Sequence, residues 1–121
     1  DISGIGDGTF TGGLAALNNS LAGKVSTKNI AVVKPKETVE ITLPFNSVGF
    51  LVFNGASNTM QSLCQYNGFS NGVAIRTVGT QGSSVSYGIK SGTNNIFTVS
   101  NLATGNVLIV DAISIRGNFP Q

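Results

Sequence analysis

The stretch TVEITLPFNSVGFLVF, residues 38–53, decides the fold that this sequence predicts. Its first six residues alternate the polar side chains of Thr38, Glu40 and Thr42 with apolar ones, which is the period of a strand with one face in water. A proline ends this strand. The following run VGFLVF, residues 48–53, has apolar side chains on both faces, so we expect it to lie between two layers.

Short runs of the same kind recur at intervals of about ten residues, and turns that contain Gly and Asn separate them. The predicted strands are residues 30–34, 38–43, 48–53, 58–69, 73–78, 83–90, 96–100 and 107–116. Residues 26–29 are interpreted as a polar hinge before the first strand. This spacing is typical of an all-β sandwich or barrel, and we expect an antiparallel, jelly-roll-like β-sandwich.

The first 25 residues differ from the rest because their apolar side chains follow a helical period. A short helix is predicted from Thr9 or Thr11 to Ala22, with Gly23 after its end. Four apolar residues at spacings of four, three and four lie on one face of it: Phe10, Leu14, Leu17 and Leu21. The same spacing makes a coiled-coil seam, so copies of the chain are natural partners for this ridge. The predicted domains are a helical stalk, residues 1–25, and a head, residues 26–121.

The composition excludes several classes of function. The 121 residues are enough for one domain, and only 10% are charged, against about 25% in ordinary soluble domains. The net charge is +2 without a basic run, which argues against a nucleic-acid partner. No stretch reaches the roughly 18 apolar residues of a membrane span, so we expect no membrane insertion.

The titratable residues do not form a pattern that is typical of an enzyme. The chain has no histidine and one cysteine, Cys64, so we expect no catalytic residues, no metal site and no cofactor. The acids are Asp1, Asp7, Glu37, Glu40 and Asp111. Asp111 interrupts the apolar last strand, where a carboxylate needs a polar partner, and Arg76 and Arg116 are the candidates. An acidic pair of Asp111 with Glu37 or Glu40 is the only arrangement that could support polysaccharide cleavage.

The segment IGDGTFTGGLAALNNSL, residues 5–21, resembles the segment that precedes the C-terminal head in tail-fibre and minor structural proteins of tailed bacteriophages and prophages. Its recurring form there is I-G-D-G-T-x-T-G-A-I-x-x-L-N-x-x-L, from which this chain departs at Gly13 and Leu14. The resemblance implies a homotrimer with a β-sandwich head and with Leu14, Leu17 and Leu21 of the ridge at its three-fold seam, so that residues 1–25 would be its trimerisation segment. It also implies a place in the virion and adhesion to a host-cell surface, often to polysaccharide, without enzyme activity.

A receptor-binding head is therefore the first hypothesis, with a host-cell surface glycan or protein as its partner. We expect the receptor contacts in two loops, residues 67–72 and 79–82. The sequence does not determine which end of the head is distal. The candidate residues are Tyr66, Asn67, Phe69, Asn71 and Gln81. Two alternatives remain: a trimerisation or capping domain of a fibre that binds nothing, and a bacterial carbohydrate-binding module that acts as a monomer.

The substitution Leu17→Asp tests the predicted ridge. A charged side chain in place of an interface leucine is expected to destabilise the trimer by several kcal/mol. Each lost leucine contact accounts for about 2 kcal/mol or more, and burial of the charge accounts for the rest. The solution mass of the variant should fall below that of the wild type. An unchanged mass and an unchanged stability would show that the ridge is not at the seam.

Overall fold

The computed structural model describes residues 25–121, so the predicted N-terminal helix and its four ridge residues lie outside the described residues. The described part contains eight strands and one short 3₁₀ turn, η1. The elements are β1 (Ser26–Val33), β2 (Thr38–Thr42), β3 (Val48–Asn54), η1 (Asn58–Met60), β4 (Ser62–Gly68), β5 (Val73–Thr77), β6 (Val85–Ile89), β7 (Ile96–Asn101) and β8 (Leu108–Arg116). Within these residues no helix has the length and apolar character needed to span a membrane.

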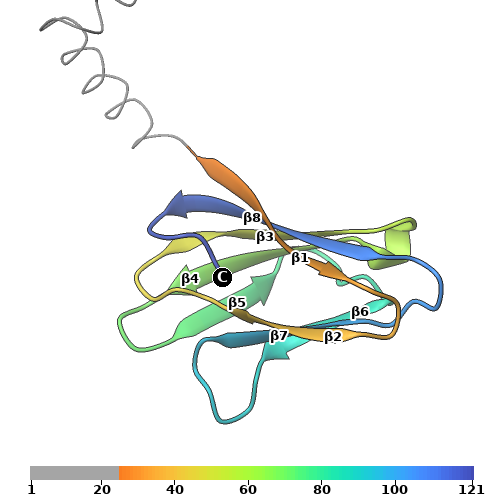
Figure 1. Cartoon of the computed structure of the whole chain (residues 1–121). Helices are drawn as coiled ribbons and strands as arrows, with labels where there is room; N and C mark the ends of the chain where they lie inside the picture. Colours follow the sequence, from red (N-terminus) through yellow and green to blue (C-terminus); the bar gives the residue numbers. More distant parts are fainter. Residues whose placement is uncertain (1–24) are drawn as a thin grey trace, which may run out of the picture.

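The strands form two antiparallel sheets that face each other as two layers (Figure 1). The larger sheet has the order β1-β8-β3-β4-β5 and the smaller sheet the order β2-β7-β6. In the larger sheet β3, β4 and β5 are consecutive neighbours and β8 returns to lie beside β3, which is the order of a Greek key. The prediction of an all-β, antiparallel fold is confirmed.

Two predicted boundaries differ from the structure by more than two residues. Residues 26–29 are not a hinge but the first half of β1, where they pair with residues 111–114 of β8. β1 is an edge strand, and residues 26–29 are held by backbone pairing with β8. Their side chains are polar and exposed, so the sequence shows no apolar alternation there that would indicate a strand. Residues 58–60 form η1 instead of opening β4, because the buried side chain of Met60 turns the chain inward before the strand begins.

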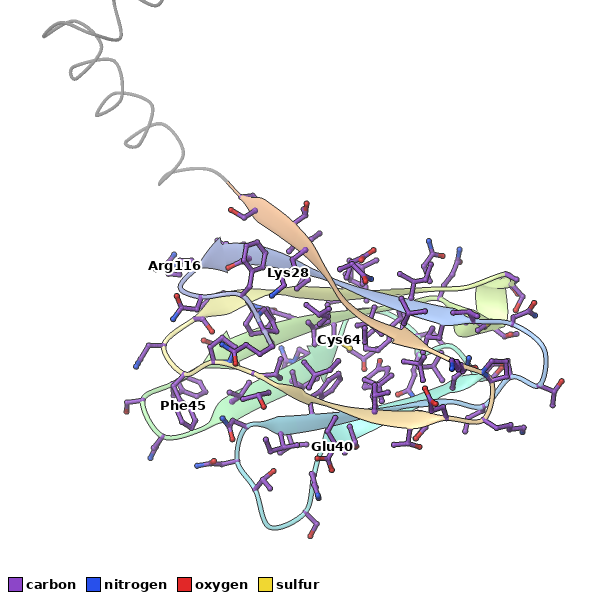
Figure 2. All side chains as sticks on the ribbon, viewed as in Figure 1. Lys28, Glu40, Phe45, Cys64 and Arg116 are labelled. Carbon is purple, nitrogen blue, oxygen red and sulfur yellow. The ribbon has the colours of Figure 1, made fainter. Side chains whose placement is uncertain are left out.

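The core lies between the sheets and is built from the inward-facing residues of both. Phe53 of β3 stacks on Tyr87 of β6, with the ring centroids 4.7 Å apart, and Phe97 of β7 packs edge-on against Phe53. Cys64 lies in the middle of this layer (Figure 2), and burial raises the pKa of its thiol. Cys64 is thus a small core residue.

The two ends of the sandwich have different surroundings. Residue 25 joins β1 at the end that also carries the β2–β3, β4–β5 and β6–β7 loops, and we call this the N-terminal end (Figure 1). The β1–β2, β3–β4, β5–β6 and β7–β8 connections lie at the opposite end, which we call the far end. The last residues cross the N-terminal end, where Phe119 packs on the core and Gln121 pairs with Thr42 through two backbone hydrogen bonds.

Tyr66 of β4 has an unusual environment in the core. Its side chain is fully buried against Gly49, where a Cβ atom would lie 2.6 Å from Tyr66 Cε2. Its hydroxyl has no hydrogen-bond partner in the described part of the chain. Burial raises the pKa of this hydroxyl above the usual 10.0, and the nearby Ser114 and Ser47 offset only part of the rise.

The substitution Tyr66→Phe is therefore expected to stabilise the fold by about 1 kcal/mol, because it removes a buried polar group that is not hydrogen-bonded. The raised pKa means that the folded state keeps the Tyr66 proton when the unfolded chain loses it. This contribution to stability is complete below about pH 10 and is lost as the pH rises further, so the advantage of the variant should grow above pH 10. Urea denaturation followed by circular dichroism at pH 8 and pH 10.5 measures both effects. A loss of stability in the variant at pH 8 would contradict this account.

Candidate functional site

The far end holds two loops together through backbone and hydroxyl hydrogen bonds. The Ser62 hydroxyl accepts a hydrogen bond of 2.8 Å from the Gly82 backbone N–H, and the Thr59 carbonyl accepts one of 2.9 Å from Ser84. Gly82 is buried under this contact, and a Cβ atom there would collide with the backbone of Thr59. The β3–β4 turn and the β5–β6 loop are thus fixed against each other, so the surface between them is preorganised.

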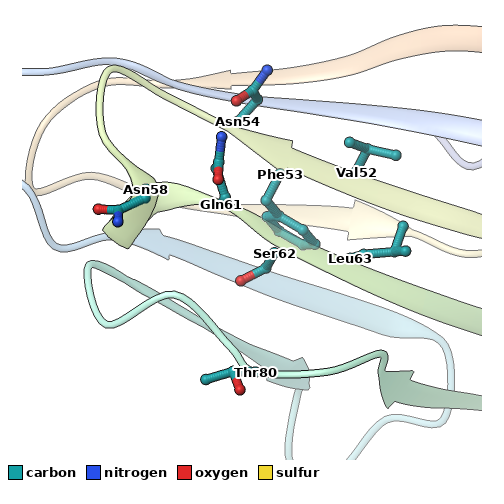
Figure 3. A pocket seen from close by; sticks show the side chains of 8 residues that line it. All are labelled: Val52, Phe53, Asn54, Asn58, Gln61, Ser62, Leu63 and Thr80. Carbon is teal, nitrogen blue, oxygen red and sulfur yellow. The ribbon is translucent and has the colours of Figure 1, made fainter.

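A cleft of about 460 Å³ opens beside this pair of loops (Figure 3). Its lining residues are Val52, Phe53, Asn54, Asn58, Gln61, Ser62, Leu63 and Thr80. Asn54, Asn58 and Gln61 are exposed, and within residues 25–121 no side-chain hydrogen bond engages their amides. Val52 and Leu63 provide a partly exposed apolar wall. No titratable side chain belongs to this lining.

Neutral donors and acceptors beside an apolar wall determine what this cleft can do chemically. Each amide offers two N–H donors and one carbonyl acceptor, and the Thr80 hydroxyl offers one donor and two lone pairs. Such groups hydrogen-bond a neutral, hydroxyl-rich ligand without burying a charge. The lining holds no nucleophile with a neighbouring base, so the arrangement is suited to binding.

The two remaining connections of the far end are fixed by one buried amide. Asn101, at the end of β7, donates hydrogen bonds of 2.9 Å to the Val33 carbonyl and 2.8 Å to the Asn106 carbonyl, and accepts one of 3.0 Å from Ala103. Its backbone also bonds to Lys36 and Glu37 in the β1–β2 turn. The far end is therefore rigid on both sides of the sandwich.

The residues predicted from sequence to bind a receptor do not lie together. Asn67, Phe69 and Asn71 lie at the N-terminal end, while Gln81 lies at the far end and donates its amide to the Val85 carbonyl. Tyr66 is fully buried, so its ring is not accessible to a ligand in this structure. The remaining four residues stay predictions, and they belong to opposite ends of the head.

The N-terminal end contains an aromatic neighbourhood that the sequence did not reveal. The Phe69 carbonyl accepts a hydrogen bond of 3.0 Å from the Asn46 backbone N–H, which brings Phe45 of the β2–β3 loop close to the Phe69 loop (Figure 2). Both phenyl rings are exposed. The far-end amides were also missed. Their only signal in the sequence is the amide-rich stretch N-G-A-S-N-T-M-Q, residues 54–61, whose pattern predicts a turn followed by a strand.

The acids of the described part lie on different surfaces. Glu40 pairs with Lys90 at 2.7 Å on the outer face of the smaller sheet, and Glu37 lies in the β1–β2 turn. Asp111 accepts a hydrogen bond of 3.0 Å from the Asn29 amide on the outer face of the larger sheet. Its partner is thus Asn29 and neither arginine, because β1 extends along β8 and places Asn29 directly opposite. Among residues 25–121 no three Cys, Asp or Glu residues gather as metal ligands would.

No family model matches this chain, and no curated protein matches its sequence. In fold it is similar to the crystal structure of the tailspike protein gp49 from Acinetobacter baumannii bacteriophage Fri1, a capsular polysaccharide depolymerase. The two share 16% sequence identity with a TM-score of 0.49, over 75% of this chain and 16% of the tailspike chain. A similarity at this level concerns the arrangement of strands and no more.

Proposed function

We propose that residues 26–121 are the attachment head of a bacteriophage tail fibre, which binds a saccharide of the host-cell surface at its far end. The chain acts as a homotrimer in the virion, outside the cell. The observation that carries this proposal is the rigid, uncharged cleft at the end opposite residue 25, whose amides make no side-chain hydrogen bond within residues 25–121. The resemblance of residues 5–21 to the segment before phage tail-fibre heads supplies the biological context.

The proposed mechanism of attachment is multivalency. One cleft with three amides and an apolar wall provides a few neutral hydrogen bonds, each with a net contribution of about 1 kcal/mol. Three clefts in one trimer turn the second and third contacts into intramolecular events, which raises the apparent affinity without any new contact. The nested pairs β1–β8 and β2–β7 support a jelly-roll-like head that presents its far-end loops together.

We propose binding without catalysis. The three described acids occupy three separate surfaces, which does not favour the converging pair that glycoside hydrolysis needs. No cofactor, metal or nucleic acid is part of the proposal.

A capping domain that binds no receptor is the second candidate. It is favoured by the lining of the far-end cleft, where the one aromatic residue, Phe53, is buried in the core. Saccharide sites commonly use an exposed ring as a stacking surface, and this cleft has none among its lining residues.

An array of bacterial lipopolysaccharides and capsular polysaccharides distinguishes the two candidates. We expect the wild-type chain to bind a subset of these glycans. The double variant Asn58→Ala/Gln61→Ala should bind the same glycans at least about tenfold more weakly, because two neutral contacts are lost from every cleft of a multivalent head. The matched variant Asn67→Ala/Asn71→Ala, which removes two amides at the N-terminal end, should bind like the wild type.

Absence of binding by the wild type to every glycan and to whole host cells would support the capping domain. Loss of binding in the Asn67→Ala/Asn71→Ala variant alone would place the receptor site at the N-terminal end instead of the far end.

A further inference from the structure

The outer faces of the two sheets differ in chemistry. The smaller sheet has Thr, Ser, Glu and Gly at its outward positions, with Ile96 as the one large apolar residue, and its Thr38 and Ser100 hydroxyls hydrogen-bond each other at 2.7 Å. The larger sheet has large apolar residues on its outer face, in the middle of three adjacent strands: Val48, Phe50, Val52, Leu63 and Ile113. An antiparallel sheet that faces water on one side normally carries polar residues there, as the smaller sheet does.

The strand register gathers these apolar residues into one patch. Phe50 lies between Ile113 and Gln65 in one row across the sheet, and Val52 lies between Asp111 and Leu63 in the next row. All five are partly exposed, and no element of residues 25–121 lies over them. We call Val48, Phe50, Val52, Leu63 and Ile113 the outer patch. A contiguous patch of this kind, bordered by polar residues such as Gln65 and Asp111, is typical of a surface that another protein covers.

We propose that the outer patch is the contact surface between copies of this chain, an inference that rests on the homotrimer of the proposed function. The position of the preceding segment favours a second copy as the occupant. Twenty-four residues precede the described part, and they join the larger sheet directly, through its edge strand β1. If their predicted apolar ridge holds copies together, it does so next to the larger sheet, and the outer patch lies on that sheet.

The charges at the rim of the outer patch fit a ring of copies. Asp111 is the one acid on this outer face within residues 25–121 and lies on the β8 side, whereas Arg76 lies on β5 at the other side. Arg116 is a further cation, at the N-terminal end. In a closed ring each contact joins one side of a subunit to the other side of the next. Such a contact brings the Asp111 side of one copy toward the Arg76 side of its neighbour.

The contact surface also borders the far-end cleft, because Val52 belongs to both. Packing over the outer patch leaves the amides of Asn54, Asn58 and Gln61 at its margin. The proposed trimer therefore places its receptor clefts along the seams between subunits.

Matched substitutions in the full 121-residue chain test the contact surface. Phe50→Lys places a charge in the outer patch on the central strand β3. Thr98→Lys places the same charge on the central strand of the smaller sheet, opposite Glu40. We expect the wild type and Thr98→Lys to sediment as trimers at micromolar concentration, and Phe50→Lys to associate at least tenfold more weakly. A trimer of unchanged mass and stability for Phe50→Lys would overturn the proposal.

Thiol labelling gives a readout that does not depend on disrupting the contact. Cys64 is buried, so the wild type should not react with a maleimide while folded. Ile113→Cys should then react at least tenfold more slowly than Thr98→Cys. Equal rates in a trimeric protein would overturn this surface and leave the proposed attachment function standing. A monomer in which Ile113→Cys is protected would place residues 1–24 of the same chain over the patch, and would also overturn the contact between copies.

Discussion

The central strands of the larger sheet, β3 and β8, carry apolar side chains on both faces, and this constraint organises the structure. Their inner faces, with Leu51, Phe53 and Val110, form one wall of the core. Their outer faces present Phe50 and Ile113 to the surroundings with no further layer of the described chain over them. Large exposed apolar patches are rare on monomers because they leave favourable burial unused. The fold of one copy therefore buries the inner apolar faces of β3 and β8 within residues 25–121 and leaves their outer apolar faces partly exposed.

The ends of the sandwich are built from polar, mostly uncharged loops. The chain has few charges, so amides and hydroxyls keep its loops in water. At the far end some of these groups hold the loops in place, as Asn101 and Ser62 do. Others, such as the amides of Asn58 and Gln61, make no side-chain hydrogen bond within residues 25–121. The same chemistry thus supplies both the rigidity of the far end and the neutral donors and acceptors that suit a saccharide.

Much of the fold could be predicted because strands with one wet face leave a period of two, as in residues 38–43. The pairing partners could not, because they depend on backbone contacts between distant segments. Asn29 opposite Asp111 is an example, since residues 26–29 look polar and irregular until β8 lies beside them. The candidate site likewise depends on contacts between segments that are distant in the sequence. Asn54, Asn58 and Gln61 come together as a candidate site only when a 3₁₀ turn and the distant Thr80 gather around them. Tyr66, which the sequence offers as a candidate receptor-binding residue, is buried.

The most direct test of the account is the solvent access of outer-patch methyl groups in the full chain, measured by NMR with a soluble paramagnetic probe. The account predicts that the methyl groups of Val52 and Ile113 are shielded nearly as well as those of the core residue Val110. Relaxation enhancements as large as those of Leu102, which is 45% exposed, would show a face open to water. That result would contradict the central claim that sister copies cover the larger sheet.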